Sequence, residues 1–226
     1  FKYLRRKVEE AGVFVLLIGD LGSHHTAFDI NVFRGIAISD DIAPFIVIND
    51  RDSKAAWSFT LIHELTHIWL GQTGISGEDS EMEVERFCNN VASEFLLPEN
   101  ELNSLALSSN LSFEEILNHI SDFALSKNIS SSMVAYKLYL QGRIDRSVWI
   151  RLSNSYRRLW QEAKDEEKDR NIGKKGGPTY YAVRRHRLGD NLISLVKQMV
   201  IGGTLTTSKA GKVLGVAQKK VPNLLE

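Results

Sequence analysis

The chain has 226 residues, of which 43% are apolar and 25% charged, and its 28 basic side chains balance its 28 acidic ones. This composition excludes a disordered or fibrous protein. The single cysteine excludes a disulfide framework, and no apolar run approaches the roughly 18 residues that a membrane span needs. Because no basic stretch leads into an apolar run at the amino terminus, we expect a cytoplasmic protein without a membrane partner.

The charges are unevenly distributed along the chain. Residues 1–140 hold 10 Lys and Arg against 20 Asp and Glu, whereas residues 141–226 hold 18 against 8. An acidic half suits a cation site, and a basic half can bind phosphate, an acidic partner or the acidic half itself. We therefore expect two functional regions, one at residues 1–110 and a helical, basic one at residues 111–226.

Short apolar runs separated by turn-forming residues open the chain. Residues 1–11 predict a helix, and the runs at residues 13–18, 35–39 and 45–48 predict three strands. We therefore expect a small β-sheet before the first long helix.

Farther along, the patterns are mostly helical. Ser80 with Glu83, and Ser112 with Glu115, are capping-box pairs that predict helix starts, the first helix running to about Leu97. The remaining predicted elements are helices at residues 129–140, 145–169 and 188–201, a strand at residues 179–183, and two helical turns within residues 206–225 joined at Gly215. The turn at Gly142 gives helix-turn-helix-like spacing, although we favour two packed core helices there.

The first long helix, predicted at residues 54–70, carries the strongest chemical pattern in the chain. It is apolar almost all round, which predicts burial, yet it contains His63, Glu64 and His67. Two histidines four residues apart lie on one helix face about 6 Å apart along the axis, so both can bind one zinc ion. Glu64 is adjacent to His63 and can serve as a general base without being a ligand.

A catalytic zinc needs a third protein ligand and a position left for water, and the next helix offers Glu81, Glu83 and Glu85. A carboxylate at Glu81 is explained by stabilisation from the helix dipole in the first turn, and one at Glu83 by the capping box. Glu85 has no such structural explanation and lies on a stripe of the helix that can face the interior. We predict Glu85 as the ligand, with Glu81 as its competitor. Asn89, one turn later, can hydrogen-bond a ligating histidine and fix the orientation of its ring.

These residues also carry a resemblance to a known family. Three segments resemble the ImmA/IrrE family of zinc metallopeptidases. They are Phe59 to Gly71 with its His-Glu-Leu-Thr-His core, the later Glu85-Arg-Phe-Cys-Asn, and the run that ends in Leu96-Leu97-Pro98. Residues 33–37 and 43–49 resemble the strands that precede the family's zinc helix. Cys88 stands where the family usually has alanine, and we interpret it as a packing residue.

The resemblance implies an α+β fold, with the small sheet packed on a zincin-type HExxH helix and a mostly helical region after it. It also implies a zinc-dependent endopeptidase that regulates transcription by cleaving a DNA-binding repressor, with zinc on His63, His67 and Glu85 and with Glu64 as catalytic base. The alternative is a transcriptional regulator or toxin-antitoxin component whose zinc is structural or sensory. An intact Glu64 favours the enzyme, because a structural zinc needs no base.

Two further questions stay open at the sequence level. Direct nucleic-acid binding by the basic half is uncertain; we expect it to be weak, because no base-reading set of Arg, Asn and Gln accompanies the turn at Gly142. The residue that stabilises the oxyanion is also undetermined, and the remaining candidates are His24, His25, His119, His186, Tyr136, Tyr180 and Tyr181.

Overall fold

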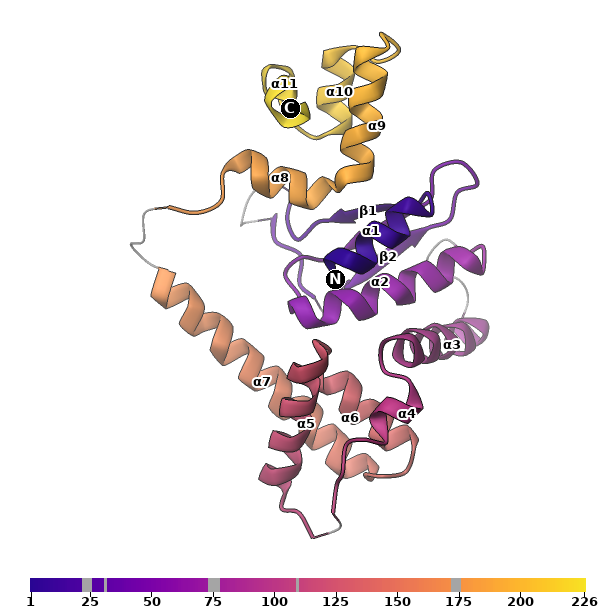
Figure 1. The fold of residues 1–226 in the computed structure, drawn as a ribbon, viewed down its shortest axis with the longest axis vertical. Helices are drawn as coiled ribbons and strands as arrows, with labels where there is room; N and C mark the ends of the chain where they lie inside the picture. Colours follow the sequence, from indigo (N-terminus) through magenta and orange to yellow (C-terminus); the bar gives the residue numbers. More distant parts are fainter. Residues whose placement is uncertain (22–25, 31, 73–77, 109, 172–175) are drawn as a thin grey trace. The chain divides into compact units, whose positions relative to one another are not determined.

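In a computed structural model of the chain, eleven α-helices and one short 3₁₀ helix accompany a three-stranded sheet over the described residues 1–21, 26–30, 32–72, 78–108, 110–171 and 176–226 (Figure 1). The elements in chain order are α1 (Lys2–Glu10), β1 (Phe14–Leu17), β2 (Gly35–Ile38), β3 (Phe45–Ile48), α2 (Lys54–Trp69), α3 (Glu78–Leu96), α4 (Glu99–Leu102), α5 (Phe113–Lys127), α6 (Ser131–Leu140), α7 (Arg146–Asn171), α8 (Tyr180–Leu188), α9 (Asp190–Ile201), α10 (Thr207–Val213), η2 (Gln218–Lys220) and α11 (Val221–Leu225).

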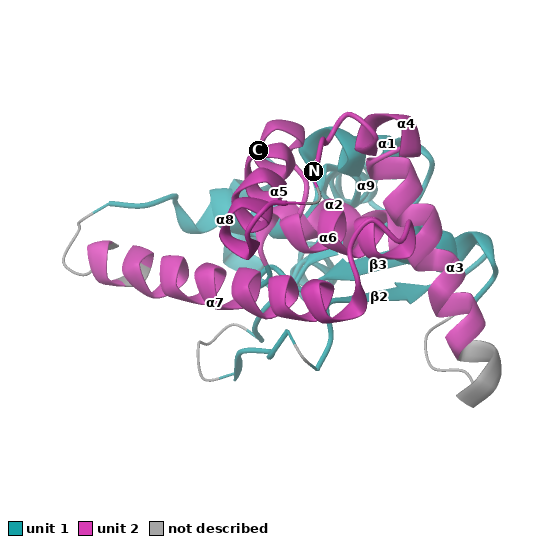
Figure 2. Cartoon of the chain, turned by 90° about the horizontal axis from the view of Figure 1, so that it is seen from below, with its two compact units in different colours: residues 1–52, 64–77, 176–226 teal, residues 53–63, 78–175 magenta. Residues whose placement is uncertain are grey.

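The chain forms two compact units, coloured teal and magenta in Figure 2. Unit 1 contains residues 1–52, 64–77 and 176–226, and unit 2 contains residues 53–63 and 78–175. The division falls within α2, so the sheet, the second half of α2 and the carboxy-terminal helices belong to unit 1. The functional division at residue 110 stays a prediction.

The sheet of unit 1 has the strand order β1-β3-β2, with β1 parallel and β2 antiparallel to the central β3. Alternation along the strands buries one face almost completely: Val15, Leu17, Ile46 and Ile48 are at most 1% exposed. On the opposite face, Phe14 and Leu16 pack against the apolar cluster of the carboxy-terminal helices. Residues 176–226 thus share a core with the first strand of the chain.

A close approach at Gly189 fixes this arrangement. Gly189 lies between α8 and α9 with φ +81°, and a β-carbon there would collide with the Val15 carbonyl and the side chains of Arg5 and Glu9. The buried Arg5 guanidinium donates hydrogen bonds to the carbonyls of Val15 and His186. It therefore ties β1 to the end of α8.

The basic region also neutralises acidic groups from the amino-terminal half. Arg187 Nε lies 2.7 Å from Asp50 Oδ2, and Arg187 Nη2 lies 2.8 Å from Asp20 Oδ2. Hydrogen bonding to Asp20 is the main cause of the raised pKa of Arg187. One of the predicted roles of the basic half, binding the acidic half, is thus present at Arg187.

Removing the guanidinium group of Arg187 should destabilise unit 1. The Arg187 side chain is 24% exposed, and those of Asp20 and Asp50 are 18% and 15% exposed, so solvent screens the pairs only in part. We expect Arg187→Met to lower the free energy of unfolding by about 1–3 kcal/mol in urea denaturation, because two carboxylates lose the guanidinium between them. Arg158→Met is the control: its pair with Glu162 is exposed at 3.8 Å, and the loss should stay below about 0.5 kcal/mol. Equal losses would contradict the role of Arg187.

Unit 2 is a helical bundle built around one apolar cluster. Ile120 of α5, Leu138 of α6 and Leu152 of α7 are fully buried in it. At the start of α5, the backbone N–H of Glu115 donates to Ser112 Oγ and that of Ser112 donates to Glu115 Oε2, which confirms the predicted capping box. The helices on either side of Gly142 pack on each other as predicted.

The α+β fold class predicted from the sequence is confirmed, but two elements differ from prediction. Helix α3 begins at Glu78, two residues before the start predicted at Ser80. The strand predicted at residues 179–183 is wrong: Thr179 Oγ1 accepts a hydrogen bond from the Ala182 N–H and starts helix α8. Among the described residues, no helix has the length and apolar character needed to cross a membrane.

Candidate metal centre

Helix α2 places its polar residues in a largely apolar setting. Leu61 and Leu65 are buried on it, and Glu64 and Thr66 are buried as well, at 7% and 2% exposure. The predicted burial fails at the end of the helix, where Trp69 is 71% exposed. Because a buried polar group is retained at a cost in free energy, the middle of α2 is the part of the helix with a chemical role.

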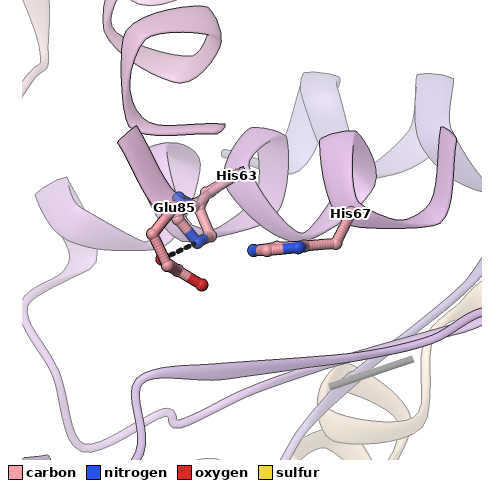
Figure 3. A group of neighbouring side chains, drawn as sticks. All are labelled: His63, His67 and Glu85. Carbon is pink, nitrogen blue, oxygen red and sulfur yellow. Dashed lines mark ion pairs between the residues drawn. The ribbon is translucent and has the colours of Figure 1, made fainter. Parts of the chain in front are cut away.

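The structure brings His63, His67 and Glu85 together (Figure 3). One ligand atom from each lies within 4.8 Å of the other two, and His63 Nε2 is 3.2 Å from Glu85 Oε2. Phe59, one turn before His63, stacks on its ring with centroids 6.1 Å apart. The two histidines extend from one face of α2, and Glu85 reaches them from α3.

This donor set fits zinc. Two ligands about 2.1 Å from a tetrahedral ion lie about 3.4 Å apart, so the His63 and Glu85 atoms are already at that separation. The largest distance between two of the donor atoms is at most 4.8 Å, and a small rotation of a side chain reduces it to the separation that a tetrahedral ion needs. Within the described part of the chain the group holds three donors and no fourth, which is the number that catalytic zinc sites have.

The exposure of the ligands leaves the site accessible. The side chain of His63 is 13% exposed and that of Glu85 is 53% exposed. The interior position that the stripe allows for Glu85 is not adopted, because its side chain is half exposed while lying 3.2 Å from His63. The Glu85 carboxylate is therefore open to water, whereas His63 is largely covered.

The other candidates from the sequence are placed as follows. Glu83 is exposed on α3, and the side chain of Glu81 lies outside the described residues. Cys88 is buried without a disulfide, in keeping with a packing residue. Asn89 lies one helical turn from Glu85 and is partly buried, and its orienting role stays a prediction.

None of the oxyanion candidates that the structure describes is a member of the group of His63, His67 and Glu85. Tyr136 contacts Trp149, with ring centroids 5.6 Å apart, and Tyr180 and Tyr181 pack edge to face on α8. His119 is exposed on α5. His24 and His25 lie outside the described residues.

Comparison with protein families adds the decisive observation. The model of the IrrE N-terminal-like domain, Peptidase_M78, matches residues 9–139, which include the sheet, α2 and α3. The chain belongs to this family. Membership confirms the resemblance seen in the sequence and indicates a metallopeptidase, in which the group of His63, His67 and Glu85 can hold the metal. A search of curated proteins gives no match to this chain.

Proposed function

We propose that this M78-family member is a zinc-dependent endopeptidase that acts in the cytoplasm and regulates transcription by cleaving a DNA-binding repressor. The observation that carries the enzymatic part is the convergence of His63, His67 and Glu85 next to Glu64 on a family peptidase domain. The repressor as substrate and the cytoplasmic site of action rest on the family resemblance and on the sequence composition.

The choice of zinc follows from the chemistry of the donors. Two imidazole nitrogens and one carboxylate oxygen are a common catalytic zinc set, whereas magnesium and calcium prefer oxygen ligands alone. Three donors leave a coordination position open. A structural zinc would prefer four protein ligands, and this favours the peptidase over the alternative of a regulator with a structural or sensory zinc.

The chain's own residues divide the work of peptide hydrolysis. His63, His67 and Glu85 would hold the ion, which when bound polarises the scissile carbonyl and acidifies the attacking water. Glu64 accepts the proton of that water as it attacks the carbonyl carbon, and it then delivers the proton to the leaving amine nitrogen. Burial of Glu64 keeps competing bulk water away from this carboxylate during the transfer.

Metal removal tests this proposal directly. The purified chain should contain about one zinc per molecule by elemental analysis, and it should cleave a repressor encoded next to its own gene at a single site, identified by mass spectrometry. Chelation should abolish cleavage, and stoichiometric zinc should restore it. A chain that binds zinc and leaves the repressor intact would refute the substrate; cleavage that survives chelation would refute the metal mechanism.

A further inference from the structure

The carboxy-terminal helices form a three-helix arrangement that the peptidase chemistry does not use. Helices α9, α10 and α11 each contact the other two, and all three lie together in Figure 1. Their shared core consists of side chains from each helix: Leu192 and Val196 of α9, Ala210 and Leu214 of α10, and Val221 and Leu224 of α11. Two short helices joined by a tight turn and supported by a third helix are the architecture of a helix-turn-helix.

The turn between α10 and η2 has the residues that this motif requires. Gly215 adopts φ +60°, a left-handed conformation that glycine reaches without strain. A β-carbon on Gly211 would lie 2.8 Å from the Val216 carbonyl oxygen, so a side chain there would force the turn away from α10. Arg184 Nε donates a 3.0 Å hydrogen bond to the Leu214 carbonyl at the end of α10. The second helical segment, residues 218–225, is thereby held close against the first.

The outer face of this segment presents the chemistry that DNA recognition needs. Gln218 and Lys219 are exposed at its start, and Lys209 and Lys212 are exposed on α10. Within the described part of the chain, these lysines make no ion pair. A glutamine amide can bind an adenine edge in both donor and acceptor roles, and lysines neutralise backbone phosphates.

The three arginines of α8 do not share this availability. Arg184 and Arg185 donate to the carbonyls of Leu214 and Leu224, and Arg187 pairs with acidic side chains. Lys220 lies over the Tyr180 ring, 4.1 Å from its centroid. In the described residues 190–226, the exposed lysines are Lys197, Lys209, Lys212 and Lys219, and the last three lie in the two helices that a helix-turn-helix places on DNA.

We propose that residues 206–225 are a helix-turn-helix whose second helical segment, residues 218–225, enters the major groove of duplex DNA. The weak DNA binding expected from the sequence rested on the turn at Gly142, whereas the structure places the motif at Gly215. This inference goes beyond the proposed peptidase and does not depend on it.

Selection from a randomised duplex library, with the full chain as bait, tests the proposal. We expect a short enriched sequence, and binding of that duplex, measured by fluorescence anisotropy, should weaken about 40-fold between 50 and 200 mM salt if about three lysines contact phosphates. Glu64→Gln should bind equally well, which separates this test from that of the peptidase. Absence of any enriched sequence, or equal affinity for duplex RNA, would overturn the proposal.

Three variants locate the contact. Lys219→Ala should weaken binding to every duplex and reduce the salt slope by about 0.9, whereas Gln218→Ala should relax selection at one base pair and cost about tenfold or more on the enriched sequence. Lys2→Ala on α1 removes the same charge elsewhere in unit 1 and should bind like the unmodified chain. Both test residues are exposed, so all three variants should melt at the same temperature. Equal binding by Lys219→Ala and Lys2→Ala would overturn the proposal.

Discussion

Glu64→Gln should retain zinc and fold yet lose about 10²- to 10⁴-fold in kcat. The amide has the size of the carboxylate but cannot accept the proton of the attacking water. Glu64 is absent from the group of metal donors, so all three ligands stay in place. We therefore expect kcat to fall while KM changes little, because substrate binding does not use this proton transfer.

The measurement combines cleavage kinetics with metal analysis of the same sample. Glu83→Gln is a matched control, since it makes the same substitution at an exposed position of α3 outside the donor group. It should cleave at the unmodified rate. Undiminished hydrolysis by Glu64→Gln would remove Glu64 from the mechanism, and loss of zinc in that variant would show that its carboxylate supports the ligands instead.

Local patterns predicted most of the peptidase region correctly because its elements follow from short spacings. The runs at residues 13–18, 35–39 and 45–48 became strands β1, β2 and β3 because β-rich segments pair wherever an apolar face can be buried. The histidine pair on α2 follows from the helical repeat alone. Family membership and the α+β class were accessible for the same reason.

Contacts between distant residues were beyond such reasoning. Arg187 meets Asp20 from 167 positions away, and nothing in either local sequence indicates the partner. At residues 179–183 a β-prone run became helix because the Thr179 cap and the residues after it favoured helix over strand. Glu85 lies with the two histidines, as a ligand must, but its role as the third ligand stays a prediction, and its exposure was not foreseen.

The helix-turn-helix was missed for a different reason. The turns at Gly142 and at Gly215 both have a left-handed glycine, so glycine alone does not distinguish these two turns. A β-carbon on Gly142 would meet open space, whereas the turn at Gly215 is accompanied by the close approach at Gly211. A small residue four positions before the turn glycine, with Val221 and Leu224 after it, is the pattern that could have identified the motif from the sequence.

Glu85→Ala should lower zinc affinity by more than about 100-fold, because it removes one of the three metal donors. Loss of a group that only hydrogen-bonds a ligand already lowers metal affinity by about 10- to 100-fold. The expected mechanism is loss of coordination rather than of fold. Glu85 is half exposed on α3, and alanine is a better helix former than glutamate. Competition with a chromophoric chelator measures the affinity, and circular dichroism of the metal-free chain checks the helix content.

Glu83→Ala is the control on the same helix. It changes the same residue type two positions away and lies outside the donor group, so its zinc affinity should stay within about twofold of the unmodified chain. Because Glu83 is exposed on α3, the free energy of unfolding should change little. Equal zinc loss in both variants would mean that the acidic face of α3 acts only through its summed charge. Loss confined to Glu81→Ala would assign the third ligand to Glu81 and leave Glu85 as a neighbour of His63 that the metal does not use.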